Sequence, residues 1–291
     1  MQTMPRPIAD LINARYSCRT YRDEPLTPDQ RTCLTGHLAA HTVGPFGSRA
    51  RFALVAAAAD DRAALKRLGT YGFIKGATGF LVGAVQHGPK DLEDYGYLVE
   101  QAILVATDLR LGTCWLGGTF TKGRFAARMC GLERDETMPA VVSLGAIGDD
   151  GTERIREREA GSRRLPASSL FFEERWGEPL ALDAGDPFAA VLEGVRMAPS
   201  ASNKQPWRVV RRGDDWHFFL QRTKGYGKGS ALFAVLRLAD LQRVDLGIAL
   251  CHFELAAREL GLTGEWVLGE PEIGSLAQGV EYVATWQTAR A

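Results

Sequence analysis

Two short segments far apart in the chain carry the side chains best suited to hold a ligand. Residues 198–207 read Ala-Pro-Ser-Ala-Ser-Asn-Lys-Gln-Pro-Trp. The two prolines restrict the backbone at both ends and keep the residues before them out of the helical region. The loop therefore offers Ser200, Asn203 and Gln205 in a preset shape, and amides supply both a donor and an acceptor. A polar, constrained loop beside an apolar strand is typical of a binding element.

The second segment lies near the N-terminus, where Arg15, Ser17 and Arg19 occupy alternate positions. In an extended backbone these three side chains point to the same side. Two guanidinium groups and a hydroxyl form a good clamp for a phosphate group. The pattern is weak by itself because arginine is common in this chain. The alternative interpretation is a solvated basic turn at the end of a helix.

Together the two segments resemble those of the flavin-dependent nitroreductase family. Three further stretches resemble that family in the same order along the chain, namely Leu109–Gly118, Pro139–Gly145 and Arg163–Pro166. The resemblance implies an α+β nitroreductase-like fold that binds one FMN non-covalently. It also implies a ping-pong reaction in which NAD(P)H delivers hydride and leaves before a nitroaromatic or quinone-type acceptor takes the electrons. Because the cofactor carries this chemistry, no protein side chain is predicted to be catalytic.

The resemblance also assigns the parts of the cofactor site. It places the phosphate between the arginine–serine clamp and a basic tail, the ribityl chain and ring against the polar loop, and the flavin edge near two glycines. Lys75 resembles the family's flavin-contacting lysine, where a cation would stabilise negative charge on the reduced ring; an exposed loop lysine is the alternative. The predicted cofactor-binding residues are Arg15, Ser17, Arg19, Lys75, Gly117, Gly118, Arg163, Arg164, Ser200, Asn203 and Gln205.

One departure from the family pattern is that the chain separates the clamp from the polar loop. Where the family places that loop, this chain has Val43–Arg49, which lacks the asparagine and the Gln-Pro-Trp sequence. A shift of 151 residues aligns Asp94–Trp115 with Asp245–Trp266 at seven identities, where chance would give about two. The alternative is that two buried helices have converged on leucine and alanine. We expect two degenerate halves that form a single-chain pseudo-dimer, with one complete site and one decayed site.

The predicted halves are residues 1–178, with the phosphate clamp, and residues 179–291, with the polar loop. The charged stretch Asp149–Arg164 is the expected crossover between them, and its alternating charges favour a solvated face. The family is normally a homodimer with flavin sites at the subunit interface. The resemblance therefore implies that this chain can act as a monomer.

Composition and charge argue against several other classes of protein. The 291 residues are 45% hydrophobic and 24% charged, as is ordinary for a globular protein. A formal net charge of zero gives no general attraction to nucleic acid or membranes, and no window resembles a transmembrane helix. Five scattered cysteines without a Cys-x-x-Cys pair indicate reduced thiols and a cytoplasmic protein.

The coarse pattern alternates helices and strands. Residues 27–30, Thr-Pro-Asp-Gln, form a capping box that predicts a helix to about His41. Two long helices are predicted over Asp91–Leu111, ended by Gly112, and Leu241–Leu260, ended by Gly261. Strands are predicted at Ala53–Ala59, Phe80–Val85, Trp207–Arg212, Trp216–Gln221 and Glu281–Gln287, and the family resemblance implies a last core strand at Pro139–Gly145.

Three other interpretations compete with this scheme. Cys33, His37 and His41 share one helix face with a spacing that can hold a metal, but no fourth ligand lies nearby, and we predict no metal site. Lys224–Ser230 is expected to be a flap over the cleft or a plain loop. The main alternative function is an FMN-storing or FMN-sensing protein without turnover. A structural protein that has lost its flavin is the third.

Overall fold

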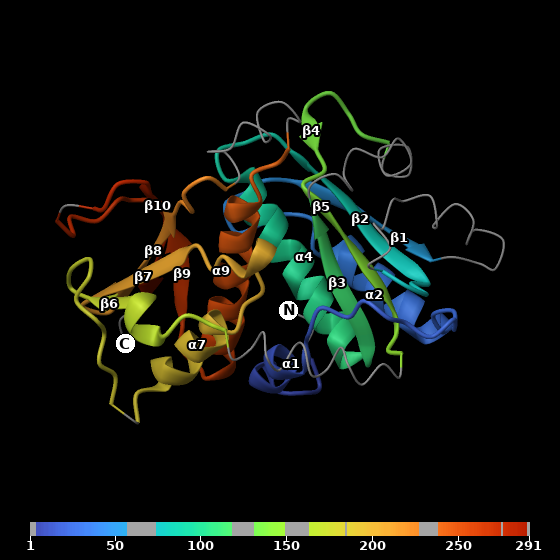
Figure 1. The fold of residues 1–291 in the computed structure, drawn as a ribbon, viewed down its shortest axis with the longest axis horizontal. Coiled ribbons are helices and arrows are strands. Elements are labelled where there is room, and N and C mark those ends of the chain that lie inside the picture. Colours follow the sequence, from blue (N-terminus) through green and yellow to red (C-terminus); the bar gives the residue numbers. More distant parts are fainter. Residues whose placement is uncertain are drawn as a thin grey trace.

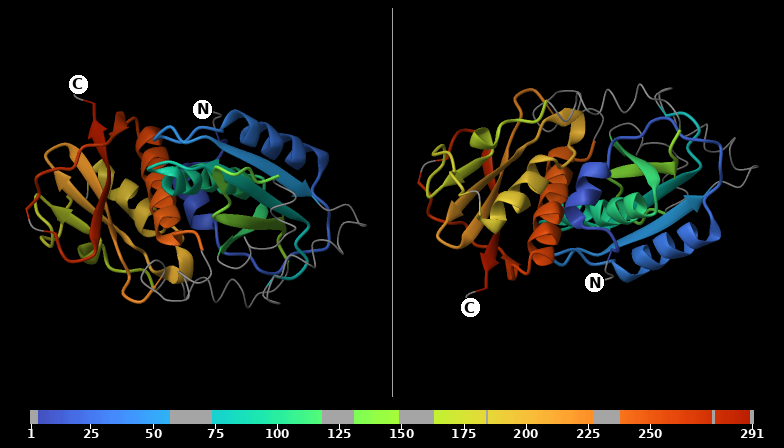
Figure 2. Two further views of the ribbon diagram at one scale, coloured as in Figure 1. Left: turned by 90° about the horizontal axis from the view of Figure 1, so that it is seen from above. Right: turned by 90° about the horizontal axis from the view of Figure 1, so that it is seen from below.

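The computed structural model describes residues 4–56, 74–117, 131–148, 163–183, 185–226, 238–274 and 276–289. Two five-stranded sheets lie on opposite sides of a central pair of helices (Figure 1). The central helices are α4 (Asp91–Asp108) and α9 (Leu241–Glu259), and both are buried along most of their length. Views from above and below show the same three layers (Figure 2). The protein is α+β, as the sequence predicted.

The first half supplies the sheet with the order β1-β2-β5-β3, and β4 pairs with β2. Its elements besides α4 are α1 (Ile8–Ala14), α2 (Pro28–Ala40), β1 (Ala50–Ala56), β2 (Gly79–Gln86), β3 (Leu111–Gly117), β4 (Glu136–Thr137) and β5 (Ala140–Ala146). Neighbouring strands of this sheet are antiparallel.

The second sheet has the order β6-β7-β8-β10-β9. The second half supplies α9, α7 (Pro187–Arg196), the 3-10 turn η4 (Ala201–Asn203), β7 (Trp207–Arg212), β8 (Asp215–Gln221), β9 (Gly264–Val267) and β10 (Val280–Thr288). The end of the first half adds the 3-10 turn η3 (Ala167–Ser169) and β6 (Phe171–Glu173) to this side of the molecule. The run α7-β7-β8-α9-β9-β10 has the same order and sheet connectivity as α2-β1-β2-α4-β3-β5. Strand β6 is added parallel to β7 at the edge of this second sheet.

The two central helices cross closely at positions related by the 151-residue shift. A Cβ on Gly96 would overlap the carbonyl oxygen of Val244, and a Cβ on Gly247 would overlap that of Glu93. The shift converts Glu93 and Gly96 into Val244 and Gly247, so the two contacts are reciprocal. The sequence repeat therefore coincides with a local two-fold relation between α4 and α9, and glycine is needed at both crossings because nothing larger fits.

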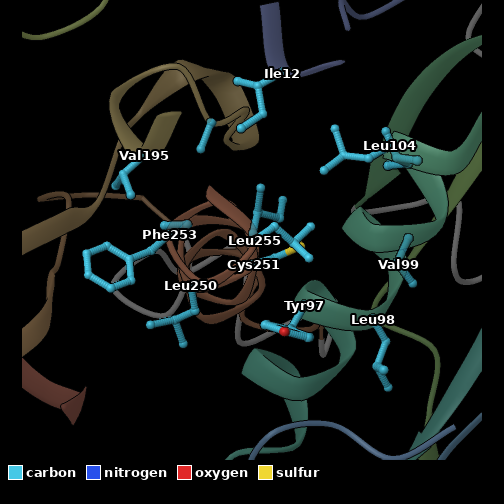
Figure 3. Close-up of a cluster of buried hydrophobic side chains, with 14 of the residues drawn as sticks. Ile12, Tyr97, Leu98, Val99, Leu104, Val195, Leu250, Cys251, Phe253 and Leu255 are labelled. Carbon is cyan, nitrogen blue, oxygen red and sulfur yellow. The ribbon is translucent and has the colours of Figure 1, made fainter. Parts of the chain in front are cut away.

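A shared apolar core joins the halves around these helices. Figure 3 shows side chains from α1, α4, α7 and α9 gathered in one cluster, among them Ile12, Val195 and Phe253. Each fully buried side chain of this size contributes about 1.5–3 kcal/mol to folding. This core is continuous across the two halves, and each sheet also has a smaller apolar cluster of its own.

Most predicted elements are confirmed, with one correction. Thr27 and Gln30 form the expected capping box at the start of α2, and Gly213 turns the β7–β8 hairpin at φ +59°. Helix α4 was predicted to reach Leu111, but it ends at Asp108, and residues 111 and 112 begin β3. Arg110 takes the left-handed turn at φ +61°. Pairing of β3 with β5 satisfies the backbone of this segment, which another helical turn would have removed from the sheet.

Some predictions fall outside the described residues, namely Gly118, the crossover up to residue 162 and the flap from residue 227 onward. In the described ranges, no helix combines the length and apolar composition that crossing a membrane requires.

Candidate functional site

The clamp segment lies along the open edge of β3. Ser17 forms a parallel bridge with Thr113 of β3, and Thr20 forms another with Lys75. The Lys75 backbone N–H donates to the carbonyl oxygen of Arg19 at 2.8 Å. The structure thus brings Ser17, Arg19 and Lys75 together, although Lys75 is distant from the clamp in sequence.

Arg15 differs from its neighbours in the clamp because its side chain is turned inward. The side chain is 6% exposed, and its Nε lies 3.9 Å from Oε1 of Glu100 on α4. Nε is buried without a hydrogen bond, and the terminal nitrogens make none with the residues that the structure describes. Arg19 instead donates from Nη1 to the carbonyl oxygen of Ser17 at 3.2 Å. Arg15 is therefore a positioned guanidinium with unused donors.

Glu100 is the centre of a buried polar network that joins the two halves. Its Oε2 accepts from Trp115 Nε1 at 2.8 Å, and its Oε1 lies 3.1 Å from Nε2 of His252 on α9. The other ring nitrogen, Nδ1, lies 2.9 Å from the carbonyl oxygen of Gly194 on α7. Burial alone would raise the pKa of Glu100, but the bond to His252, the charge of Arg15 and the bond from Trp115 bring that pKa below its ordinary value. This network was not predicted from the sequence. Its one local indication there is Glu100, a charged residue within an apolar stretch of helix.

The polar loop has an unusual backbone. Ser202, Asn203 and Gln205 adopt positive φ angles of 53°, 54° and 49°. This left-handed region costs a non-glycine residue roughly 1–2 kcal/mol, with asparagine the most tolerant. Ser200 Oγ accepts from the backbone N–H of Gln205 at 2.9 Å and so helps to close the loop. Strain of this kind is commonly retained where a loop must hold one shape for a ligand.

Gln205 holds the loop together from inside. Its side-chain Oε1 accepts from the backbone N–H of Leu165 at 2.7 Å, and its Nε2 donates to the carbonyl oxygen of Asn203 at 3.0 Å. The residue is 2% exposed. The flavin contact predicted for this amide stays a prediction. In the structure both of its ends are bonded to backbone groups and so support the shape of the loop.

The basic tail meets the loop directly. Arg164 donates from Nη1 to Oδ1 of Asn203 at 2.7 Å and from Nη2 to the carbonyl oxygen of Met197 at 3.0 Å. Nδ2 of Asn203 in turn donates to the carbonyl oxygen of Arg163 at 3.4 Å. Three of the predicted site residues are therefore in contact, and they join the end of the crossover to the second half.

Each half also anchors a loop with an aspartate from its central helix. Asp94 accepts from the backbone N–H groups of Phe46 at 2.9 Å and Ser48 at 2.8 Å, one on each oxygen. Asp245, its partner in the repeat, accepts from Ala201 at 2.9 Å through Oδ1 alone. Its Oδ2 is buried without a hydrogen bond to any described residue. Burial raises the pKa of both carboxyls, and that of Asp245 lies well above its ordinary value.

The start of α9 brings the end of β3 close to the polar loop. A Cβ on Gly117 would lie 2.7 Å from the side chain of Leu241, the first residue of α9. Asp245, one turn later, anchors the loop, and His252, two turns further, reaches Glu100 beside Arg15. Helix α9 of the second half therefore contacts the first-half and second-half parts of the predicted site.

Two other features lie apart from this arrangement. His37 and His41 stack with ring centroids 4.1 Å apart, and no group of three or more metal-ligating side chains is found among the described residues. A hollow of about 610 Å³ contains none of the predicted site residues; it is lined by Asp215, Thr263, Gly264, Glu265, Gln287, Thr288 and Ala289.

Comparison with known proteins identifies the fold. A family model described as "Putative TM nitroreductase" matches residues 7–257. The structure of a putative nitroreductase from Thermotoga maritima superposes with a TM-score of 0.58 at 18% identity, covering 98% of this chain and 95% of that one. A putative nitroreductase in complex with FMN from Desulfovibrio desulfuricans has a TM-score of 0.41 at 20% identity, over 50% of this chain and 89% of that one. None of the curated proteins matches the chain.

Proposed function

The chain belongs to the Putative TM nitroreductase family, and from this membership we propose that it is an FMN-dependent NAD(P)H oxidoreductase. Bound FMN would supply the redox chemistry, by accepting a hydride from NAD(P)H and passing electrons to a nitroaromatic or quinone-type acceptor in a ping-pong cycle. The residues of this chain then bind the cofactor, orient it and shape the cleft.

The observation that carries the proposal is the state of Arg15. A buried carboxylate orients the guanidinium group from one side, and its terminal nitrogens are without a hydrogen bond among the described residues. The terminal nitrogens can donate, and a phosphate group accepts two such N–H bonds in parallel. The donor set therefore fits the phosphate end of FMN.

Other residues complete the proposed site from both halves. Ser17 and Arg19 would hold the phosphate, and Lys75 would balance negative charge on the ring. Arg163 and Arg164 would add positive charge from the basic tail, and the backbone groups of Gly117 and Gly118 would bind the flavin edge. Ser200, Asn203 and Gln205 would bind the ribityl chain and ring, and Gln205 also supports the shape of the loop. The orphaned Oδ2 of Asp245 provides a second polar atom to which a bound ligand could supply a partner.

We also propose that the halves, residues 1–178 and 179–291, arose by duplication and act as a self-contained, cytoplasmic monomer with one flavin site. Support comes from the repeated order of elements and from the reciprocal glycine contacts between α4 and α9. Strand β6 of the first half joins the sheet of the second half, as an arm exchanged between subunits would.

An anaerobic absorption spectrum tests this proposal. The purified protein should be yellow, should release FMN and not FAD on denaturation, and should bind about one FMN per chain. NADH or NADPH should bleach it, and a nitroaromatic should restore the colour. A flavin that stays oxidised with both nicotinamides would support the storage or sensing alternative. A colourless protein that fails to bind micromolar FMN would contradict the proposal, as would two FMN per chain or loss of FMN on dilution to a monomer.

A further inference from the structure

We propose that Glu100 and His252 form a pair that bridges the two halves and positions Arg15 to bind the FMN phosphate. The inference rests on the proposed function and goes further by assigning two positioning residues for the same site. Neither residue belongs to the motifs that indicated the cofactor. Both side chains are fully buried, so they would act through Arg15 and not by contact with the ligand.

The hydrogen-bond partners define the charge of the pair. Nδ1 of His252 faces the carbonyl oxygen of Gly194, which can only accept, so this nitrogen carries a hydrogen. Nε2 faces a carboxylate oxygen that also has the Arg15 cation nearby. Trp115 donates to the other carboxylate oxygen. Each of these neighbours favours ionised Glu100, so Nε2 also carries a hydrogen and His252 is an imidazolium.

This charge count leaves one positive charge uncompensated. Glu100 contributes one negative charge, whereas His252 and Arg15 contribute one positive charge each. The imidazolium is enclosed between Glu100 and the backbone of Gly194, whereas the terminal nitrogens of Arg15 have no hydrogen bond to the described residues, so an added anion would pair with Arg15. In a medium of low dielectric constant such an excess attracts an anion strongly. The pair thus fixes the direction of the guanidinium, and the three side chains together keep one positive charge that a bound anion would neutralise.

The same pair depends on the association of the two halves. Arg15 and Glu100 come from the first half, and His252 and Gly194 come from the second. A shift of α9 along α4 would remove the imidazolium from Glu100. The carboxylate would then compete with a phosphate for the nitrogens of Arg15. Correct docking of the halves is therefore coupled to phosphate binding.

Glu254 provides a matched control on α9. This buried carboxylate accepts from Trp266 Nε1 and from the hydroxyl of Tyr97 at 2.9 Å, and it pairs with Arg258. Like Glu100, it is a buried carboxylate that contacts a tryptophan, an arginine and a residue of the other half. Its arginine lies on the surface with a 39% exposed side chain, away from the clamp. Glu254→Gln should therefore perturb the interior similarly and leave the phosphate site intact.

The test compares FMN with riboflavin, which lacks the phosphate, by fluorescence titration of the full chain. Glu100→Gln and His252→Gln should each weaken FMN binding by about tenfold and change riboflavin binding by less than about twofold. Glu254→Gln should change neither affinity. In the unliganded protein, the ¹⁵N NMR signal of the Arg15 Nε–H, assigned with Arg15→Lys, should shift in both pair variants and not in Glu254→Gln.

The outcomes separate this inference from the proposed function. Equal losses of FMN and riboflavin affinity, or no loss of either, would overturn the positioning role. If the unmodified protein binds neither flavin, the proposed function fails, and an unshifted Arg15 signal in the pair variants would overturn the positioning as well. If Glu100→Gln does not fold, His252→Gln decides the question, because it keeps a donor toward Glu100 and removes the imidazolium charge together with the bond to Gly194.

Discussion

The loops at residues 43–49 and 199–206 occupy corresponding places in the two halves, but they are held differently. Asp94 binds the first loop through both carboxylate oxygens, whereas Asp245 binds the second through one. The first loop is satisfied by its own half. The second has three residues at positive φ, a polar surface and an orphaned oxygen beneath it. The comparison shows that two corresponding loops of one repeat can differ in backbone conformation and in how completely the aspartate beneath them is hydrogen-bonded.

The two tryptophans that correspond in the repeat also have different partners. Phe46 of the first loop packs edge-on against Trp266 of the second half at 6.4 Å between ring centroids. Trp115, the counterpart of Trp266, donates to Glu100 beside the unused nitrogens of Arg15. One tryptophan of the repeat thus has an apolar ring contact, and its counterpart has a charged partner. This difference supports our proposal of a single retained flavin site.

The largest difference should be between the two arginines that pair with buried glutamates, Arg15 and Arg258. Arg15→Ala should weaken FMN binding by about 1.5–3 kcal/mol, because a charge-assisted bond to phosphate is lost. Arg19→Ala should act in the same direction. Arg258→Ala, on the other central helix, should leave FMN affinity unchanged in the same titration. Equal effects of Arg15→Ala and Arg258→Ala would erase the distinction between the two halves.

The next largest difference should be in the unfolding free energies of variants at the two loop-anchoring aspartates, measured by urea denaturation of the flavin-free protein. Asp94→Asn places an amide N–H₂ against one of two backbone donors and should cost about 1–3 kcal/mol of unfolding free energy. Asp245→Asn can keep its one accepted bond through Oδ1 and should cost less than about 1 kcal/mol. A larger loss for Asp245→Asn would mean that Oδ2 has a partner that supports the fold.

Asn203 should show a smaller effect with two components. Asn203→Ala removes the acceptor for Arg164 and places alanine, which tolerates the left-handed region less well than asparagine, at φ 54°, for a loss of roughly 1 kcal/mol in stability. Asn203→Gly relieves the backbone and should recover that stability. Both variants should lower FMN affinity if the side chain contacts the cofactor. Normal FMN binding by Asn203→Gly would limit the role of Asn203 to backbone geometry.

The smallest expected effect is a pH dependence of the unfolding free energy, and the Asp245→Asn variant tests it. Burial raises the pKa of Asp245 well above its ordinary value of 3.8, so the folded state retains a proton that the unfolded state releases. This contribution to stability is complete below 3.8 and is lost as pH rises toward the raised pKa. Asp245→Asn should therefore become more stable relative to the unmodified protein as pH increases over this window. A difference independent of pH would show that Asp245 is ionised in the folded protein.

Much of the fold could be predicted because its signals are local. The capping box at Thr27, the hairpin turn at Gly213 and the two long apolar helices depend on residues adjacent in sequence. The end of α4 could not be predicted correctly. Leu111 continues the helical pattern, and only its pairing with Ala146 across the sheet assigns it to a strand.

The candidate site was also only partly predictable from the sequence. The residue types of the clamp, the loop and the basic tail were evident in the sequence, as was the repeat that relates Asp94 to Asp245. Their partners were not evident. Nothing local indicates that Gln205 braces the loop from inside or that Lys75 lies beside Arg19.

By itself, the sequence determined the element types, the family resemblance and the duplicated pattern, because propensity, periodicity and motif spacing act over short stretches of chain. The tertiary structure decided which polar groups are satisfied. Glu100 meets His252 across 152 residues only because α4 and α9 cross at Gly96 and Gly247. Burial then turns that contact into a strong electrostatic constraint on Arg15, since charges removed from water must be balanced by whichever groups the packing places beside them.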